Sequence, residues 1–285
     1  MELIFAAAIC SVLVSIVLKA CRAKGFNPVQ MITWNYASAS LLCFLWFKPD
    51  LAHISIYKTP WILIVALGVL LPAIFYCLAR SLQTAGILKT ELAQRLSVVL
   101  SLCAAYFVFN EYFNAIKLVG IALGVLAVLL ILFSQRKGNA NNDNSGIIFL
   151  LSVWAGYALI DVLLKFASGL GMQFAVTLNL VFICAFILSS IYNLVQYSNL
   201  GQTKNIIAGL GLGVLNFANI ALYVKAHMLL KETPAVVFAG MNILVVIFGV
   251  VAGLIIFKER LRTATVFGLI AGIMSVVCLA YAMSL

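Results

Sequence analysis

The chain contains ten apolar runs, each long enough to cross a lipid bilayer as a helix. A transmembrane helix needs about 20 predominantly apolar residues, and mostly short polar breaks separate the runs. They cover residues 3–20, 29–47, 61–83, 88–109, 115–134, 146–166, 172–195, 205–229, 234–257 and 263–284. The runs are continuous and lack the alternation of an outer-membrane β-barrel. The sequence therefore predicts an all-α membrane protein with ten transmembrane helices.

Composition and charge agree with a membrane location. Hydrophobic residues make up 65% of the chain and charged residues 9%, against about 25% charged in soluble proteins. The net charge of +10 comes from Lys and Arg placed mostly at the ends of the runs, where basic side chains anchor helices at the interface. We therefore expect the lipid bilayer, and no nucleic acid, as a partner. Seven cysteines without a C-x-x-C pair and two histidines predict no metal site and no cofactor.

A short pattern occurs twice along the chain. An acid in a polar break is followed by one glycine nine residues later and by a second glycine four residues after that. The two copies are Glu111, Gly120, Gly124 and Glu259, Gly268, Gly272, related by a shift of 148 residues in a chain of 285. Such a shift predicts a duplication. We expect a first five-helix repeat at 1–134, a polar linker at 135–145 and a second five-helix repeat at 146–285.

The number of helices per repeat determines how the repeats are oriented. Five is odd, so the second copy enters the membrane upside down relative to the first. The two repeats are then related by a pseudo-two-fold axis in the membrane plane. Inverted repeats of this kind are typical of secondary transporters that work by alternating access.

Two stretches resemble a known family of transporters. They are FNEYFNAIKLVGIALGVLAVLLIL (109–132) and FKERLRTATVFGLIAGIMSVVCLAYA (257–282). In a ten-span layout they resemble the EamA-type branch of the drug/metabolite transporter (DMT) superfamily. The resemblance implies secondary transport of small metabolites, often export, through a central cavity, with both termini inside. The excess of Lys and Arg in loops after odd-numbered runs favours both termini outside. Family members frequently carry an Arg in the second span, where this chain has WNYASAS.

Charges inside the runs are the strongest candidates for a functional site, because each costs at least about 2.5–3.5 kcal/mol at mid-helix. Glu91 and Arg95 in the fourth run, and Asp161 and Lys165 in the sixth, are spaced four residues apart and so share a helix face. Arg95 could bind a substrate carboxylate or phosphate, and the acids could carry a proton. The alternative is that these groups are neutralised locally and reach toward the interface.

Other polar residues within the runs are expected to face protein or water. Those predicted to contact solute are Gln94, Tyr157, Asn35, Asn179, Asn219, Tyr223 and Asn242. Hydrogen bonding between helices is the alternative role for each of them. Gly120, Gly124, Gly268 and Gly272 predict close helix packing, either sealing each half or forming a dimer face. Glu111 and Glu259 are expected to act as helix caps or interfacial anchors.

The leading functional hypothesis is a secondary transporter in the plasma (inner) membrane of a prokaryote. It would export or exchange a small polar metabolite, such as an amino acid or organic anion, as a monomer or homodimer. The alternatives are a channel or scaffold subunit that associates through its GxxxG faces, and a carrier of larger anions such as nucleotide sugars. The sequence contains no phosphate-binding loop. It also contains no visible nucleophile–base pair, so we expect no enzymatic activity.

Overall fold

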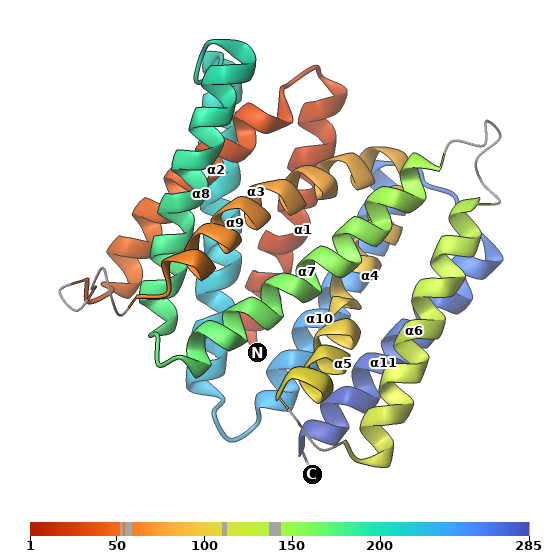
Figure 1. Cartoon of the computed structure of the whole chain (residues 1–285). Coiled ribbons are helices and arrows are strands. Elements are labelled where there is room, and N and C mark those ends of the chain that lie inside the picture. Colours follow the sequence, from red (N-terminus) through yellow and green to blue (C-terminus); the bar gives the residue numbers. More distant parts are fainter. Residues whose placement is uncertain (52–53, 55–58, 110–112, 137–143, 285) are drawn as a thin grey trace.

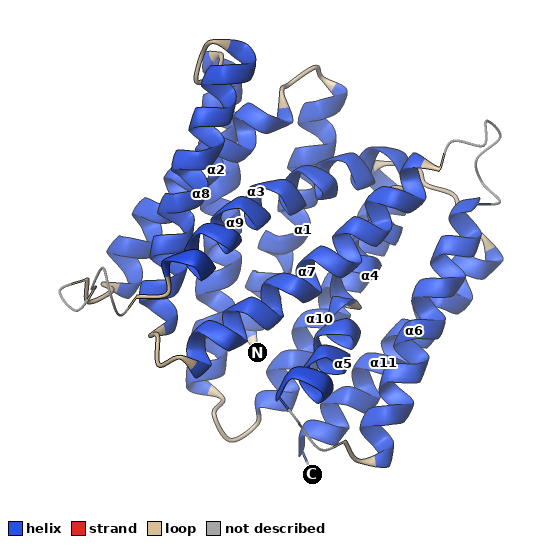
Figure 2. Cartoon of the chain, viewed as in Figure 1, coloured by secondary structure: helices blue, strands red, loops and turns tan. Residues whose placement is uncertain are grey.

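The computed structural model describes the chain except residues 52–53, 55–58, 110–112, 137–143 and 285. The described residues form helices and no strands (Figures 1 and 2). The first half contains α1 (Glu2–Ala23), α2 (Pro28–Phe47), α3 (Trp61–Thr84), α4 (Ile87–Arg95), α5 (Ser97–Phe109) and α6 (Ala115–Arg136). The second contains α7 (Ser145–Gly169), α8 (Phe174–Tyr197), α9 (Thr203–Leu229), α10 (Pro234–Val251), the π-helix η1 (Ala252–Ile256) and α11 (Thr263–Ser284). Eight segments of the described chain are long and apolar enough to cross a membrane. The all-α membrane fold is confirmed.

The fourth predicted run is not one helix, which corrects the expectation for residues 88–109. It is divided into α4 and α5 at Leu96. Two hydrogen bonds satisfy carbonyl groups at the break: Ser97 Oγ donates to the Gln94 carbonyl at 2.7 Å, and Trp154 Nε1 of α7 donates to the Leu96 carbonyl at 2.9 Å. Non-helical backbone inside a membrane protein is tolerated where protein groups satisfy it. The ninth run ends in the π-helix η1, so the two corresponding spans are both irregular.

The helix contacts follow the symmetry that an inverted duplication produces. In the most extensive contacts, α1 packs on α9 and α10, while α7 packs on α3, α4 and α5. Likewise α2 packs on α9, and α8 packs on α3. Three further pairs, α2 with α8, α4 with α10 and α6 with α11, join spans that occupy the same position in each half. These are the pairs expected beside a two-fold axis. The inverted repeats at 1–134 and 146–285 stay a prediction, and most of the linker, residues 137–143, lies outside the described chain.

The outer surface of the bundle is apolar. Ile62 of α3 is 90% exposed and Val195 of α8 is 80% exposed. A soluble protein rarely exposes large contiguous apolar patches, whereas in a bilayer these side chains contact lipid tails. The linker follows α6, so we call the end of the bundle at which α1, α3 and α6 finish the linker end.

The repeated glycines lie where α6 and α11 pack together. A Cβ on Gly120 would approach Leu279 of α11 to 2.9 Å, and one on Gly268 would approach the Ala127 carbonyl of α6 to 3.2 Å. Gly124 and Gly272 are equally close to side chains, with Ser275 and Leu92 within 2.9 Å of the added Cβ. Ser275 Oγ donates to the Gly120 carbonyl at 2.6 Å. The small residues therefore allow two helices of the same chain, one from each half, to approach closely.

Candidate functional site

Two serines of α1 hold the charged pair of α4. Ser15 Oγ donates a hydrogen bond to Glu91 Oε1, and Arg95 Nη2 donates to Ser11 Oγ. Ser11 and Ser15 are four residues apart, as are Glu91 and Arg95, so the two bonds form successive rungs between antiparallel helices. Glu91 is only 1% exposed. The predicted acid–base pair of α4 therefore faces the interior of the bundle.

The second predicted acid lies on α7, which packs on both α4 and α5. Asp161 of α7 accepts a hydrogen bond from Ser101 Oγ of α5 at 3.0 Å. Asp161 is itself exposed. Lys165, one turn further along α7, is exposed.

Two tyrosines connect the charges of α4 and α7. Tyr157 of α7 interacts electrostatically with Arg95, Glu91 and Asp161. Tyr223 of α9 interacts with Arg95 and Asp161. The structure thus brings together five of the predicted site residues from one helix of the first half and two of the second. We call Glu91, Arg95, Tyr157, Asp161 and Tyr223 the central cluster.

The central cluster keeps polar atoms that protein groups do not satisfy. Three buried polar atoms here have no hydrogen-bond partner among the described residues: Glu91 Oε2, Arg95 Nε, and Oδ1 of Asn219, one turn from Tyr223 on α9. A buried polar atom left unsatisfied costs about 1–3 kcal/mol. Binding a polar molecule that supplies these bonds would recover part of that cost. The chemistry of the cluster, with one guanidinium, two carboxyls and two phenols, suits a small charged or zwitterionic solute.

Other predicted contact residues take part in bonds between or within helices. Asn35 of α2 is buried and accepts a hydrogen bond from Asn216 of α9 at 3.3 Å. Asn179 of α8 donates to the Ser40 carbonyl of α2 at 3.0 Å. Asn242 donates to the Phe238 carbonyl one turn earlier in α10, at 2.8 Å. For these three asparagines a role in solute binding stays a prediction, and so it does for Gln94, whose side chain is half-buried.

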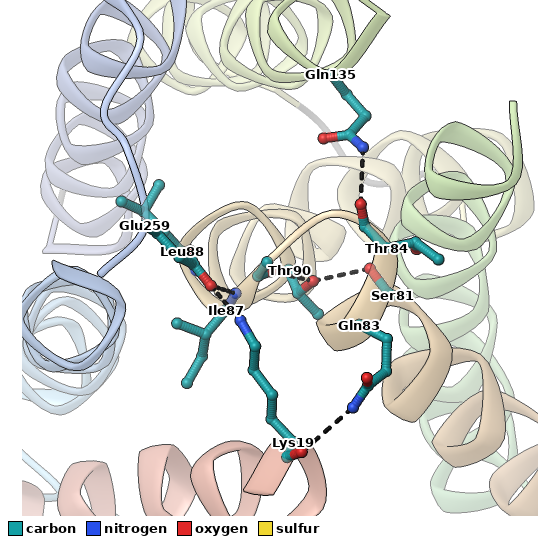
Figure 3. A network of polar contacts seen from close by, with 10 residues as sticks. Lys19, Ser81, Gln83, Thr84, Ile87, Leu88, Thr90, Gln135 and Glu259 are labelled. Carbon is teal, nitrogen blue, oxygen red and sulfur yellow. Dashed lines mark hydrogen bonds and ion pairs between the residues drawn. The ribbon is translucent and has the colours of Figure 1, made fainter. Parts of the chain in front are cut away.

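Glu259 caps a helix of the other half. Its carboxylate pairs with Lys19 of α1 and accepts hydrogen bonds from the backbone amides of Ile87, at 2.7 Å, and Leu88, at 3.3 Å (Figure 3). These amides lie in the first turn of α4 and have no acceptor within the helix, and negative charge is favoured at a helix N-terminus. Glu111, the other predicted cap, lies outside the described residues.

The cap depends on a glycine. Gly86 precedes α4 with a φ of +94°, and a Cβ at this position would come within 2.7 Å of the Glu259 carboxylate. Glycine alone adopts such a backbone without strain and leaves room for the acid. Around the cap lies a pocket of about 350 Å³ whose charged lining residues are Lys19, Lys89, Arg260, Arg262 and Glu259. The pocket at the linker end is therefore strongly basic.

The sequence analysis missed the serines that hold the central cluster. Ser11, Ser15 and Ser101 are small residues inside apolar runs, and a hydroxyl costs much less than a charge in a membrane helix, so they do not stand out. The i,i+4 spacing of Ser11 and Ser15, which matches Glu91 and Arg95, is the signal that could have identified them.

Comparison with known proteins identifies the family. Residues 2–133 match the model of the EamA-like transporter family. The chain is also 35% identical over 290 residues to an uncharacterized protein of Haemophilus influenzae, covering 98% of this chain and 97% of that protein. The chain belongs to the EamA-like transporter family. This family is part of the drug/metabolite transporter superfamily, so the protein is a multi-pass membrane protein of a transporter family.

Membership gives the central cluster its context. The matched residues of this EamA-like protein include α1 and α4. They therefore contain both rungs of the Ser11–Arg95 and Ser15–Glu91 ladder.

Proposed function

We propose that this EamA-like protein is a secondary transporter that moves a small polar metabolite, such as an amino acid or organic anion, by alternating access. One observation carries the proposal: hydrogen bonds and electrostatic interactions place Arg95 and two acids from different halves in one polar cluster. Charged residues inside a membrane bundle typically mark a solute or ion pathway. The proposed location is the inner membrane of a bacterium, in keeping with the Haemophilus relative.

Arg95 is the proposed anchor of the solute. Its guanidinium already donates one hydrogen bond, to Ser11, while Nε has no partner among the described residues. A guanidinium binds carboxylates through two parallel N–H bonds. Tyr157 of α7 and Tyr223 of α9 add hydroxyl groups that interact electrostatically with Arg95. A solute held between these helices contacts both halves, so relative movement of the halves changes its access.

Glu91 and Asp161 are the proposed coupling groups. Glu91 Oε2 has no hydrogen-bond partner among the described residues. Glu91 also packs against Gly249 of α10, where an added Cβ would lie 3.1 Å from the Cγ of Glu91. The Asp161 carboxylate accepts a hydrogen bond from Ser101 Oγ at 3.0 Å. Each acid could take up a proton as its surroundings change, or balance the ammonium group of an amino acid. Proton coupling and exchange both follow from this arrangement.

The cap at Glu259 is the proposed closure of the linker end. It joins α1 and the N-terminus of α4 to the segment after η1. The other end of α4 carries Arg95, so α4 links the closure to the solute site. The basic pocket around the cap would attract anions electrostatically. Opening this end requires Glu259 to leave the α4 amides.

The scaffold alternative has weaker support. It relies on GxxxG faces that are free to bind another protein, but the four repeated glycines are covered by α4, α5, α6 and α11 of the same chain.

Transport by purified protein in liposomes tests the proposal. Saturable counterflow of one radiolabelled amino acid or organic acid from a panel is the expected result. Arg95→Ala should abolish this counterflow, whereas Arg80→Ala should retain most of it. Arg80 is the control because its guanidinium carbon lies over Phe149, 5.3 Å from the ring centre, and it is not a member of the central cluster. Counterflow of the whole panel at the rate of empty liposomes, or equal solute affinity with and without Arg95, would contradict the proposal.

A further inference from the structure

A groove of about 740 Å³ lies between α3 and α8 near the linker end. Its walls are Val69, Pro72, Ala73 and Tyr76 of α3, and Leu188, Ser189, Tyr192 and Tyr197 of α8. The first turns of α2 form the floor, and Arg22 and Phe26 lie at its mouth. None of these residues belongs to the central cluster.

The groove begins where α3 and α8 stop touching. The two helices are in tight contact at Gly68, where an added Cβ would lie 2.5 Å from Cys184 Sγ. One turn later α3 contains Pro72, which removes a backbone hydrogen bond and typically bends a helix. Beyond this point the side chains of the two helices line the groove.

The groove is open sideways to the membrane. Val65, Val69 and Tyr76 of α3 are 47%, 53% and 36% exposed, and Ala73 between them is also exposed. Their spacing of three to four residues places them on one face of the helix. At Val65 this face lies outside the groove and contacts lipid, and from Val69 to Tyr76 it forms one wall of the groove. A molecule of the bilayer can therefore enter without crossing the protein.

The polar end of the groove is positively charged. Arg22, in the last turn of α1, is half-buried. Its guanidinium has neither a hydrogen bond nor an ion pair within the described part of the chain, and no Asp or Glu is among the described lining residues. Tyr192 and Tyr197 lie at the same end, and tyrosines are typical of the membrane interface.

We propose that this groove binds an anionic phospholipid, with the phosphate at Arg22 and one acyl chain along Val69, Ala73 and Leu188. The charge at the mouth and the apolar walls match the two parts of such a lipid. From Leu188 to Tyr197 the wall extends about 14 Å along α8 at 1.5 Å per residue, which is about half of the 30 Å hydrocarbon core. The groove thus has the depth of one leaflet. Basic pockets between transmembrane helices are known to bind anionic headgroups.

Lipid retention measured by native mass spectrometry tests the site. The purified full chain is delipidated and then exposed to equal amounts of phosphatidylglycerol and phosphatidylcholine. The wild-type protein should retain more phosphatidylglycerol. Arg22→Gln should lower this preference about five-fold, the factor expected for one basic residue near the membrane surface. Lys24→Gln is the matched control, because Lys24 is exposed two residues away and does not line the groove.

A second pair of variants tests the apolar part. Ala73→Trp fills the groove and should reduce retention of both lipids, whereas Val65→Trp, on the same exposed face but outside the groove, should not. Each variant must first elute at the same volume as the wild-type protein on size-exclusion chromatography. If Ala73→Trp fails this check, Val69→Trp replaces it. The proposal is overturned if Arg22→Gln and Lys24→Gln act alike, or if neither groove filler lowers lipid retention. It is also overturned if a soluble metabolite of the transport panel, and no lipid, competes for the groove.

Discussion

Glu259 of the second half pairs with Lys19 of the first while its carboxylate accepts the backbone amides of Ile87 and Leu88. The ammonium group and the helix N-terminus both favour negative charge at the same point. One carboxylate therefore holds three helical segments together at the linker end. An ion pair alone would not require an acid in this position, because its charges could be exchanged. The helix amides do require an acceptor.

Exchange of the two charges separates these contributions. Glu259→Gln should lower the free energy of unfolding by about 2 kcal/mol, since it weakens a charge-assisted cap. The double variant Lys19→Glu, Glu259→Lys restores opposite charges but places an ammonium group at the α4 amides. We expect this exchange to recover little of the loss in thermal stability measured in detergent. Full recovery would mean that only the ion pair matters.

Gly86→Ala should destabilise the protein more than a positive-φ glycine normally does. Its φ is +94°, and the new Cβ would lie 2.7 Å from Glu259. Gly171→Ala is the control, because φ is +82° there and nothing lies within 4 Å of the added atom. Backbone strain of about 1–3 kcal/mol applies to both, so the difference in melting temperature reports the contact with Glu259. Equal shifts would show that the cap adjusts freely.

Ser15→Ala should weaken the central cluster. It removes the hydrogen bond to Glu91 and leaves a buried carboxyl group with both oxygens unpartnered among the described residues, at a cost of about 1–3 kcal/mol. Ser168→Ala should change thermal stability much less, because Ser168 is exposed and bonds only the Leu164 carbonyl of its own helix. If both variants melt together, Ser15 does not hold Glu91.

Trp154 should be more important for stability than another indole with the same bond. Trp154 Nε1 donates to the Leu96 carbonyl at the break between α4 and α5, and Trp34 Nε1 donates to the Leu200 carbonyl in a loop, both at 2.9 Å. Trp154→Phe removes one of two hydrogen bonds to a buried carbonyl, which keeps the Val99 amide at 3.1 Å, whereas the Leu200 carbonyl can bond water. We expect Trp154→Phe to cost about 1 kcal/mol more in thermal unfolding. A larger effect of Trp34→Phe would contradict this account of the break.

Proton coupling has its own test in the two acids of the central cluster. The double variant Glu91→Gln, Asp161→Asn should lose the dependence of transport on an imposed pH gradient. Each single variant should keep part of it if both acids carry protons. Uptake into liposomes with and without a gradient measures this. Transport at the full rate with unchanged dependence on pH would exclude both acids as coupling groups.

The sequence by itself determined the membrane fold. Runs of about 20 apolar residues with few charges have no other stable environment than a bilayer, and backbone groups in a bilayer must be satisfied within helices. The duplicated glutamate and glycines predict two halves, and the stretches that carry them resemble EamA-type transporters, the family that the comparison confirms. The cost of charge in a membrane also singled out Glu91, Arg95 and Asp161 as candidates for a functional site.

Tertiary structure alone decided which of these groups meet. No Gly or Pro marks the break at Leu96 in the sequence. The break is stabilised by Trp154, 58 positions away in the chain, which donates to the Leu96 carbonyl. Glu259 finds its partners on α1 and α4, and Ser11 and Ser15 become ligands of the charges only because α1 and α4 pack antiparallel. Local periodicity fixes which face of a helix is polar. Only the packing of helices distant in sequence decides what that face contacts.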